Sequence, residues 1–191
     1  MSEMVNFGLS NVHFSSLEFA SGAYTFQTPE AHPGSINLKM DANFETTEVY
    51  ADNTIYYVTK NNKGYDCALE VVMLKEDFEK KYLGFKTTAD GEIVETSDGK
   101  FKDFALLFQI ETDEQPNKYI LYRNSITKKP SYEFKTLEDK TEIATVTIEF
   151  KSLPLMDGSK AIKAKCPPTA KNYAAYFTTA PKSPTFTEAA A

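Results

Sequence analysis

The chain of 191 residues carries 21 lysines and arginines against 27 aspartates and glutamates, which gives a formal net charge of −6. A hydrophobic fraction of 41% excludes a disordered chain, and a content of only 8 glycines excludes a collagen-like one. The negative balance, with Arg123 as the only arginine, argues against an electrostatic grip on nucleic acid, which requires clustered lysine and arginine.

No stretch approaches the ~18 apolar residues needed to span a membrane. Residues 1–6 lack the basic and apolar regions of a secretory signal, so we expect a protein made and folded in a reducing cytoplasm. Cys67 and Cys166 are then expected to be reduced thiols, buried as small hydrophobic side chains. The length is typical of one domain that holds its core without a disulfide or a metal.

Residues 1–34 are assigned to an N-terminal arm. From residue 36 onward, apolar and polar side chains alternate, which is typical of strands. The alternation begins at Ile36–Met40 and is followed by a β-rich run at 54–59. Because asparagine and glycine tolerate positive φ, we expect residues 61–64 to form a turn that leads to a return strand at 67–74.

One short helix is expected at residues 76–83. Leu74, Phe78 and Tyr82 recur at a spacing of four, which places them on one helical face. Acidic residues at its start and lysines near its end suit the helix dipole. Gly84 is expected to follow as the glycine that ends the helix.

Two Asp-Gly pairs, Asp90–Gly91 and Asp98–Gly99, predict turns within an excursion from the main sheets. Alternation then resumes, and further strands are expected at residues 104–110, 119–126, 142–150 and 162–166. Phe104 shares one face of the first of these strands with Leu106, Phe108 and Ile110, and Ile148 and Phe150 are expected to face inward. After Cys166 the chain becomes rich in proline, threonine and alanine. We therefore expect a folded domain over residues 1–166 and a flexible tail over 167–191.

Motifs for catalysis, phosphate binding or metal binding are absent from the sequence. His13 and His32 are interpreted as isolated histidines. Acidic pairs such as Glu138–Asp139 lie in polar, turn-like segments, where solvated surface charge is a better interpretation than the carboxylate pair of a glycosidase. The sequence therefore predicts neither an enzyme nor a cofactor, and no metal site.

Tyrosines concentrate in the first third of the chain, among them Tyr24, Tyr50, Tyr56, Tyr57 and Tyr65. Cross-strand packing in a β protein accounts for most of them. A protein–protein surface is the alternative, because tyrosine is enriched at interfaces.

Residues 45–57, with the core Thr-Thr-x-x-Tyr-Ala-Asp-Asn, resemble the major tail protein of long, non-contractile phage tails (siphovirus type), in the branch common in phages of Gram-positive bacteria. The resemblance covers roughly residues 5–166 and departs from the family pattern after Arg123. Its motif residues are Thr46, Thr47, Tyr50, Ala51, Asp52, Asn53, Tyr56, Tyr57, Gly64 and Tyr65.

This resemblance implies a mainly β, tail-tube-type β-sandwich with one short flanking helix, long hairpin and loop excursions, and N- and C-terminal arms. It implies a structural virion protein of the phage tail, in which six copies form a ring and rings stack into a tube that DNA crosses during ejection. The implied partners are other copies of the chain, tail proteins at the tube ends and, transiently, genomic DNA. No membrane and no cofactor are implied.

An acidic or neutral bore would repel phosphates and let DNA slide. The bore-facing residues are expected on the polar face of the first hairpin, although the same acids could be outer-surface charges. The excursion at 90–98 and the N-terminal arm are expected to make ring-to-ring contacts. The acidic candidates for the bore are Asp41, Glu45, Glu48, Asp66 and Glu70.

Two alternatives stay open at this point. The first is a monomeric β-sandwich that binds a host surface or another virion component. The second is a carbohydrate hydrolase built on a β fold. The residues also do not separate an active phage tail from a prophage-derived or DNA-free tube.

Overall fold

The computed structural model describes residues 6–51, 53–132 and 144–186. Several sequence predictions lie outside these residues. They are Asp52 of the family motif, the acidic pair Glu138–Asp139, the first two residues of the strand expected at 142–150, and the end of the tail from residue 187.

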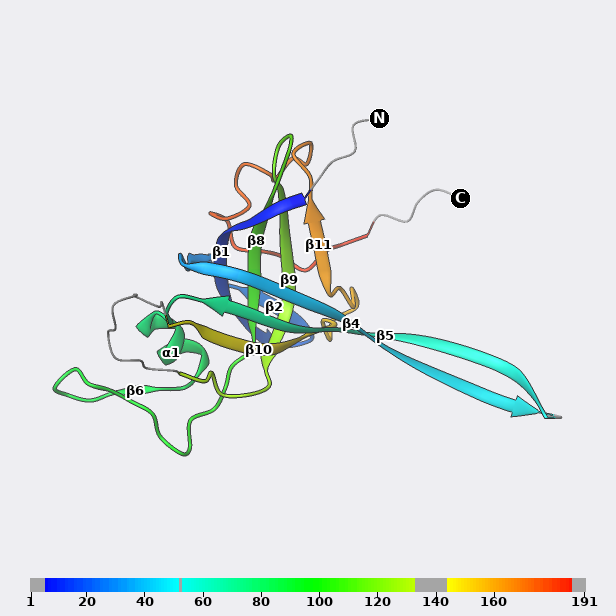
Figure 1. Cartoon of the computed structure of the whole chain (residues 1–191), viewed down its shortest axis with the longest axis horizontal. Helices are drawn as coiled ribbons and strands as arrows, with labels where there is room; N and C mark the ends of the chain where they lie inside the picture. Colours follow the sequence, from blue (N-terminus) through cyan, green and yellow to red (C-terminus); the bar gives the residue numbers. More distant parts are fainter. Residues whose placement is uncertain (1–5, 52, 133–143, 187–191) are drawn as a thin grey trace, which may run out of the picture.

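Strands dominate the described residues (Figure 1). The helix and strands are β1 (Asn6–Ala20), β2 (Ala23–Phe26), β3 (Glu30–Ala31), β4 (Ser35–Ala51), β5 (Thr54–Val71), α1 (Glu76–Tyr82), β6 (Lys86–Thr87), β7 (Ile93–Val94), β8 (Phe104–Thr112), β9 (Asn117–Ile126), β10 (Val146–Leu153) and β11 (Lys163–Cys166).

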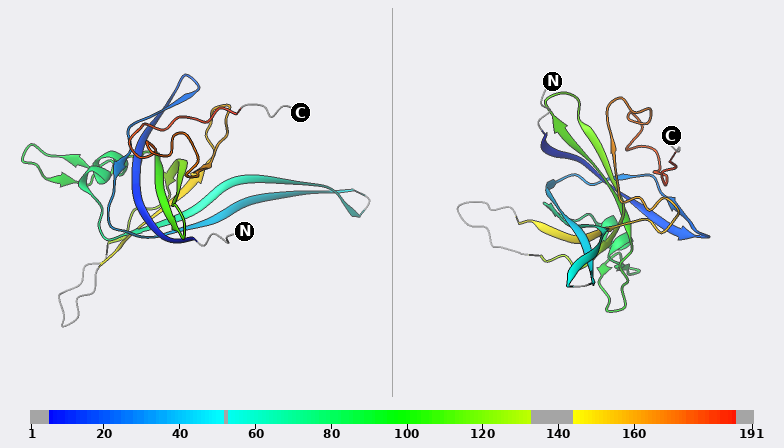
Figure 2. Two further views of the ribbon diagram at one scale, coloured as in Figure 1. Left: turned by 90° about the horizontal axis from the view of Figure 1, so that it is seen from above. Right: turned by 90° about the vertical axis from the view of Figure 1, so that its right-hand side faces the viewer.

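Nine of the described strands form one antiparallel sheet in the order β2-β1-β8-β9-β10-β5-β4, with β3 beside β1 and β11 beside β9. β9 is shared between two neighbours, because residues 118–121 pair with β11 and residues 123–126 pair with β10. The sheet bends so that β1, β8 and β9 face β10 and β5 across a common core (Figure 2). The predicted mainly β sandwich is confirmed.

The main core lies between these two layers. Phe14 of β1, Leu69 of β5, Phe104 of β8 and Ile148 of β10 are all at most 3% exposed. The ring of Phe104 contacts those of Phe14 and Phe150, each with centroids 5.3 Å apart. Each of these side chains contributes about 1.5–3 kcal/mol when fully buried. The alternation read in β8 and β10 therefore identified this core correctly.

The outer face of β8 and β9 is also covered, which alternation alone does not predict. Leu107, Ile120 and Tyr122 form a second cluster with Phe26, and Tyr176 and Phe177 pack against it. Residues up to 180 thus differ from the flexible tail expected after Cys166. The aromatic side chains anchor the segment, and two hydrogen bonds support it, from Lys118 Nζ to the Tyr173 carbonyl (2.7 Å) and from the Tyr173 hydroxyl to the Pro116 carbonyl (2.8 Å).

The N-terminal segment likewise belongs to the sheet rather than to a separate arm. β1 pairs along most of its length with β8, and β2 and β3 fold back onto β1. Of the N-terminal arm predicted at residues 1–34, residues 1–5 lie outside the described part of the chain.

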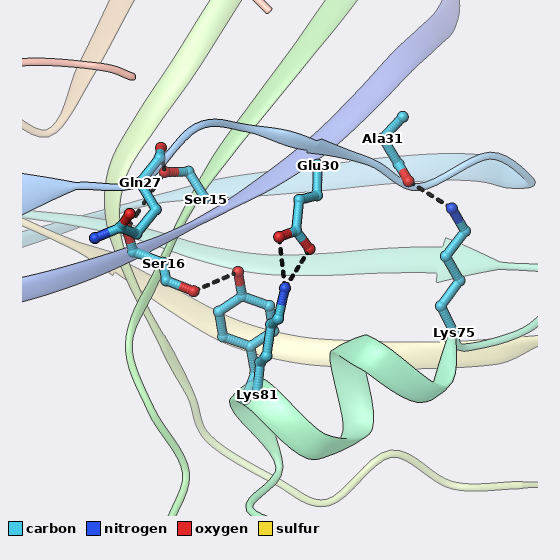
Figure 3. Close-up of polar contacts among 8 residues, drawn as sticks. Ser15, Ser16, Gln27, Glu30, Ala31, Lys75 and Lys81 are labelled. Atoms are coloured by element: carbon cyan, nitrogen blue, oxygen red, sulfur yellow. Dashed lines mark hydrogen bonds and ion pairs between the residues drawn. The ribbon is translucent and has the colours of Figure 1, made fainter. Parts of the chain in front are cut away.

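Helix α1 confirms the helix predicted at 76–83, with Leu83 as its C-cap and Gly84 following at φ +76°. It is held to the end of the N-terminal segment by two lysines (Figure 3). Lys81 Nζ contacts both carboxylate oxygens of Glu30 at 2.5 and 2.6 Å, and Lys75 Nζ donates to the Ala31 carbonyl at 2.7 Å. The helix is also anchored by its buried face, because Phe78 contacts the ring of Phe14 and Tyr82 contacts the ring of Phe104.

The turn predicted at residues 61–64 is wrong, because β5 runs through these residues as one continuous strand. The chain reverses between Ala51 and Thr54 instead, with Asn53 at φ +57°. Gly64 has φ +101°, but it marks a β-bulge at which the pairing with β4 shifts by one residue. Positive φ is shared by turns and bulges, so the sequence signal was real and its assignment was incorrect.

Gly64 also lies against β10. A Cβ atom at this position would be 1.9 Å from the Ser152 carbonyl oxygen, which only backbone movement could relieve. Gly91, in the excursion, has a similar φ of +90°, but a Cβ atom added there would meet no atom within 4 Å beyond its chain neighbours.

We predict that Gly64→Ala lowers the free energy of unfolding by about 4 kcal/mol, because left-handed strain and a backbone collision combine. Gly91→Ala, which carries the strain alone, is expected to cost about 1 kcal/mol. Urea unfolding followed by circular dichroism measures both. Equal losses for the two variants would contradict the role given to the Ser152 contact.

His32 is a buried titratable group whose ring lies 6.1 Å from that of Phe78 in helix α1. It is 2% exposed, its Nε2 lies 3.2 Å from the Met73 carbonyl oxygen, and its ring packs edge-on against Phe14. Burial lowers the pKa of His32 below its ordinary 6.5, the hydrogen bond to Met73 opposes this shift, and the charge of Lys75 adds to it. The folded protein therefore holds His32 neutral.

Because the folded-state pKa of His32 lies below the unfolded value of 6.5, its contribution to stability is complete above pH 6.5 and is lost as the pH falls below it. When the pH is lowered from 7.5 to 5.5, the free energy of unfolding should fall. We predict that it falls less in the His32→Gln variant than in the original protein. Urea titrations at both pH values measure the difference. Identical losses would show that His32 does not couple folding to pH.

Candidate functional site: a projecting hairpin arm

The outer halves of β4 and β5 project from the body as a long two-stranded hairpin (Figures 1 and 2). We call residues 44–62 the arm. Its strands pair from Phe44↔Asn62 to Ala51↔Thr54, with a second register shift near Val49 that leaves Tyr56 as an extra residue. The arm therefore begins just beyond the bulge at Gly64, and its two strands continue those of the body without a break.

The arm exposes large apolar side chains to an unusual degree. Phe44 is 62% exposed, Tyr50 is 64% exposed and Tyr56 is 80% exposed. None of them belongs to either apolar cluster of the body. A concentration of exposed apolar residues marks an interaction surface more often than isolated ones do. The exposed apolar residues of the arm are Phe44, Val49, Tyr50, Ile55, Tyr56, Tyr57 and Val58.

Alternation along the strands gives the arm two different faces. The Glu48 face comprises Phe44, Thr46, Glu48 and Tyr50 of β4 with their β5 partners Asn62, Lys60, Val58 and Ile55. The Glu45 face comprises Glu45, Thr47 and Val49 with their partners Asn61, Thr59 and Tyr57.

Polar contacts on each face stay within that face. Glu48 accepts a hydrogen bond from the Tyr50 hydroxyl at 2.7 Å, which raises the pKa of that tyrosine. Glu45 pairs with Lys63 at 2.8 Å, and this hydrogen bond and charge lower the pKa of the carboxyl group. Because all of these groups are exposed, the pairs add little to stability.

The five acids predicted for a bore do not share one face. Asp41 and Asp66 are cross-strand partners, and Glu70 lies on the same side of β5. Glu45 follows Asp41 on the same side of β4, since the two are four residues apart. Glu48 is an odd number of residues from both and therefore lies on the opposite side.

Each acid on the outer face of the body has a partner. Asp41 pairs with Lys39 at 2.6 Å, and Asp66 accepts a hydrogen bond from Asn43 at 2.9 Å and lies 3.5 Å from Lys151. Glu70 accepts a hydrogen bond from the Thr145 hydroxyl at 2.7 Å. This face is thus a mixture of paired charges rather than a strongly acidic field.

The family-motif residues map onto the arm and its base. Thr46, Thr47, Tyr50, Ala51, Asn53, Tyr56 and Tyr57 lie on the arm or in its turn, whereas Gly64 and Tyr65 lie where the arm leaves the body. The interface reading of the tyrosines is therefore favoured for Tyr50, Tyr56 and Tyr57, which no core side chain covers.

A groove beside β4 was missed by the sequence analysis. It has a volume of about 630 Å³ and lies between the inner part of β4 and strands β1, β8, β9 and β11. We call it the β4 groove; its main lining residues are Leu9, Ile36, Leu38, Met40, Ile110 and Lys163. Alternation placed Ile36, Leu38 and Met40 on one face of the strand, but it could not indicate that this face is only partly covered at the edge of the sheet.

The described residues offer no reactive centre. No three His, Cys, Asp or Glu side chains gather there as a metal site requires. Both cysteines are buried and free, as predicted, and burial raises the pKa of Cys67 to about 12, which keeps its thiol protonated and unreactive. Nor do the helical residues in these ranges form a segment that could cross a bilayer.

A comparison with protein families finds a match over most of the chain. A family model described as "Phage tail tube protein" matches residues 22–180. The match includes β4, β5, the helix and the C-terminal segment that packs on β8 and β9. A search of curated proteins finds no match to the chain.

Proposed function

Because the chain belongs to the phage tail tube protein family, we propose that six copies close into a ring and that stacked rings form the tube through which DNA leaves the phage. Membership in this family makes the protein a structural component of the phage tail rather than a member of a catalytic family. The observation that supports the assembly most strongly is the exposed arm, whose apolar side chains need a cover that the body does not supply.

The sheet edges support the same proposal. β4 is a strand of 17 residues at the edge of the sheet, and among the described strands it pairs only with β5. Long open edges invite pairing with another chain unless they are covered. In the proposed ring, adjacent copies cover these edges, and other tail proteins do so at the two ends of the tube.

The bore is proposed to present the outer face that carries Asp41, Asp66 and Glu70. Lysines on or beside this face are held by carboxylates, as in the Lys39–Asp41 pair, so they do not form a cluster that would grip phosphates. The excursion at residues 90–98 remains our proposed ring-to-ring contact. Its last residue, Asp98, pairs with Lys86, and this contact contributes to lowering the pKa of Asp98 to about 2.

We predict that the concentrated protein forms stacked rings with a central hole in negative-stain electron micrographs. A shortened variant, in which Asn-Gly replaces residues 45–61, is expected to fail to assemble because the main apolar contact surface is gone. Its melting temperature should stay within about 5 °C of the original, since the deleted residues contact mainly one another.

Two results would contradict this proposal. A protein that stays monomeric at every concentration would favour the monomeric binding module instead. A shortened variant that assembles as well as the original would remove the arm from the assembly.

We further predict that Asp41→Lys with Glu70→Lys leaves tubes intact but slows DNA ejection about ten-fold at low salt, because the new lysines bind phosphates. Raising the salt concentration should reduce the defect. The matched control, Glu18→Lys with Glu114→Lys, changes the net charge equally at exposed positions away from this face. Release of DNA from assembled particles is measured over time, and equal rates for the two variants would refute a bore lined by this face.

A further inference from the structure

The β4 groove and the arm are two uncovered apolar surfaces on the same ribbon. In the groove, Ile36 is 49% exposed, and Leu9, Leu38, Met40 and Ile110 are only partly covered. On the Glu48 face of the arm, Phe44, Tyr50, Ile55 and Val58 are all more than 40% exposed. Both surfaces are therefore apolar and incompletely covered, but one is a groove and the other projects from the body.

The arm cannot fill the groove of its own copy. β4 runs as one strand from the groove residue Met40 to Glu48 and beyond. Eight residues of extended chain separate these two positions by about 26 Å. The ribbon points away from the body, so its tip lies far from the groove of its own copy (Figure 1). Only the groove of a second copy is within its reach.

Charge selects the face of the arm that would enter. Of the described residues that line the groove, only Lys163 is charged, and its ammonium group lies 4.8 Å from the centre of the Tyr65 ring. Among the described residues of the Glu48 face, Glu48 is the one acid, and Lys60, the partner of Thr46, lies nearer the body. An apolar surface with one central carboxylate therefore complements an apolar groove with one ammonium group.

We propose that the arm of each copy docks its Glu48 face into the β4 groove of the next copy, with Glu48 paired to Lys163. This inference deepens the proposed function and rests on it in taking a second copy as the partner. The contact joins two different surfaces, so it is head-to-tail and repeats from copy to copy. Such a contact closes into a ring or continues as a helix, which is what a tube requires.

Charge exchange tests the pairing. Glu48→Lys and Lys163→Glu should each reduce pelletable assembly about ten-fold or more, because each places like charges together in a desolvated contact. The double variant restores an attractive pair in every contact and should assemble at near the original level. The matched control is Glu45→Lys, an equal charge change on the other face of the arm. Combined with Lys163→Glu, it should not restore assembly.

Cross-linking tests the contact separately from the tube. Glu48→Cys combined with Lys163→Cys should give a ladder of disulfide-linked oligomers on a non-reducing gel after mild oxidation, because Cys67 and Cys166 are buried. Either cysteine variant alone should give no ladder. A ladder without rings in micrographs would support the docking and overturn the six-membered tube.

Rings without a ladder, and without rescue by the double charge variant, would overturn the docking and leave the tube standing. Single charge variants that assemble normally would have the same meaning. A ladder that persists when residues 1–5 are deleted would also exclude the N-terminal segment of a neighbour as the occupant of the groove.

Discussion

β4 and β5 form one continuous antiparallel ribbon from the core to the tip of the arm, and the rest of the structure depends on where this ribbon loses its cover. In the body, β10 pairs with β5 and the main core packs on one face of the ribbon. Beyond the Gly64 bulge both forms of support end, and apolar side chains continue into solvent. A two-stranded ribbon is marginally stable alone in water, so the arm depends on the body for its order and, in the proposed tube, on other copies for its cover.

The exposed charged groups of β4 and β5 contribute little to holding the fold together. The net charge of −6 is modest, and many of the carboxylates on β4 and β5 are already paired with lysine or with polar side chains. Such exposed pairs add little to stability. We propose that these carboxylates occupy lysines that would otherwise bind phosphate. On the arm, Glu48 and Glu45 lie on opposite faces, so the two faces differ in their charged groups.

Much of the fold could be predicted from local sequence patterns. The alternation at 104–110 and 146–150 identified Phe104, Ile148 and Phe150 as core residues, and the spacing of Phe78 and Tyr82 identified α1. The motif around Tyr50 indicated the family that residues 22–180 match. These predictions succeeded because each depends on neighbours within a few residues along the chain.

By itself, the sequence determined the fold class, the inward-facing side of most strands, the position of the helix and the family. The tertiary structure decided that Gly64 is a bulge rather than a turn, because its close neighbour is the Ser152 carbonyl of β10, a residue distant in sequence. It also separated Glu48 from the other four acids, covered the outer face of β8 with Tyr176 and Phe177, and left the β4 groove open. Alternation tells which side chains face inward, but only the long-range pairing of strands decides where the cover over them begins and ends.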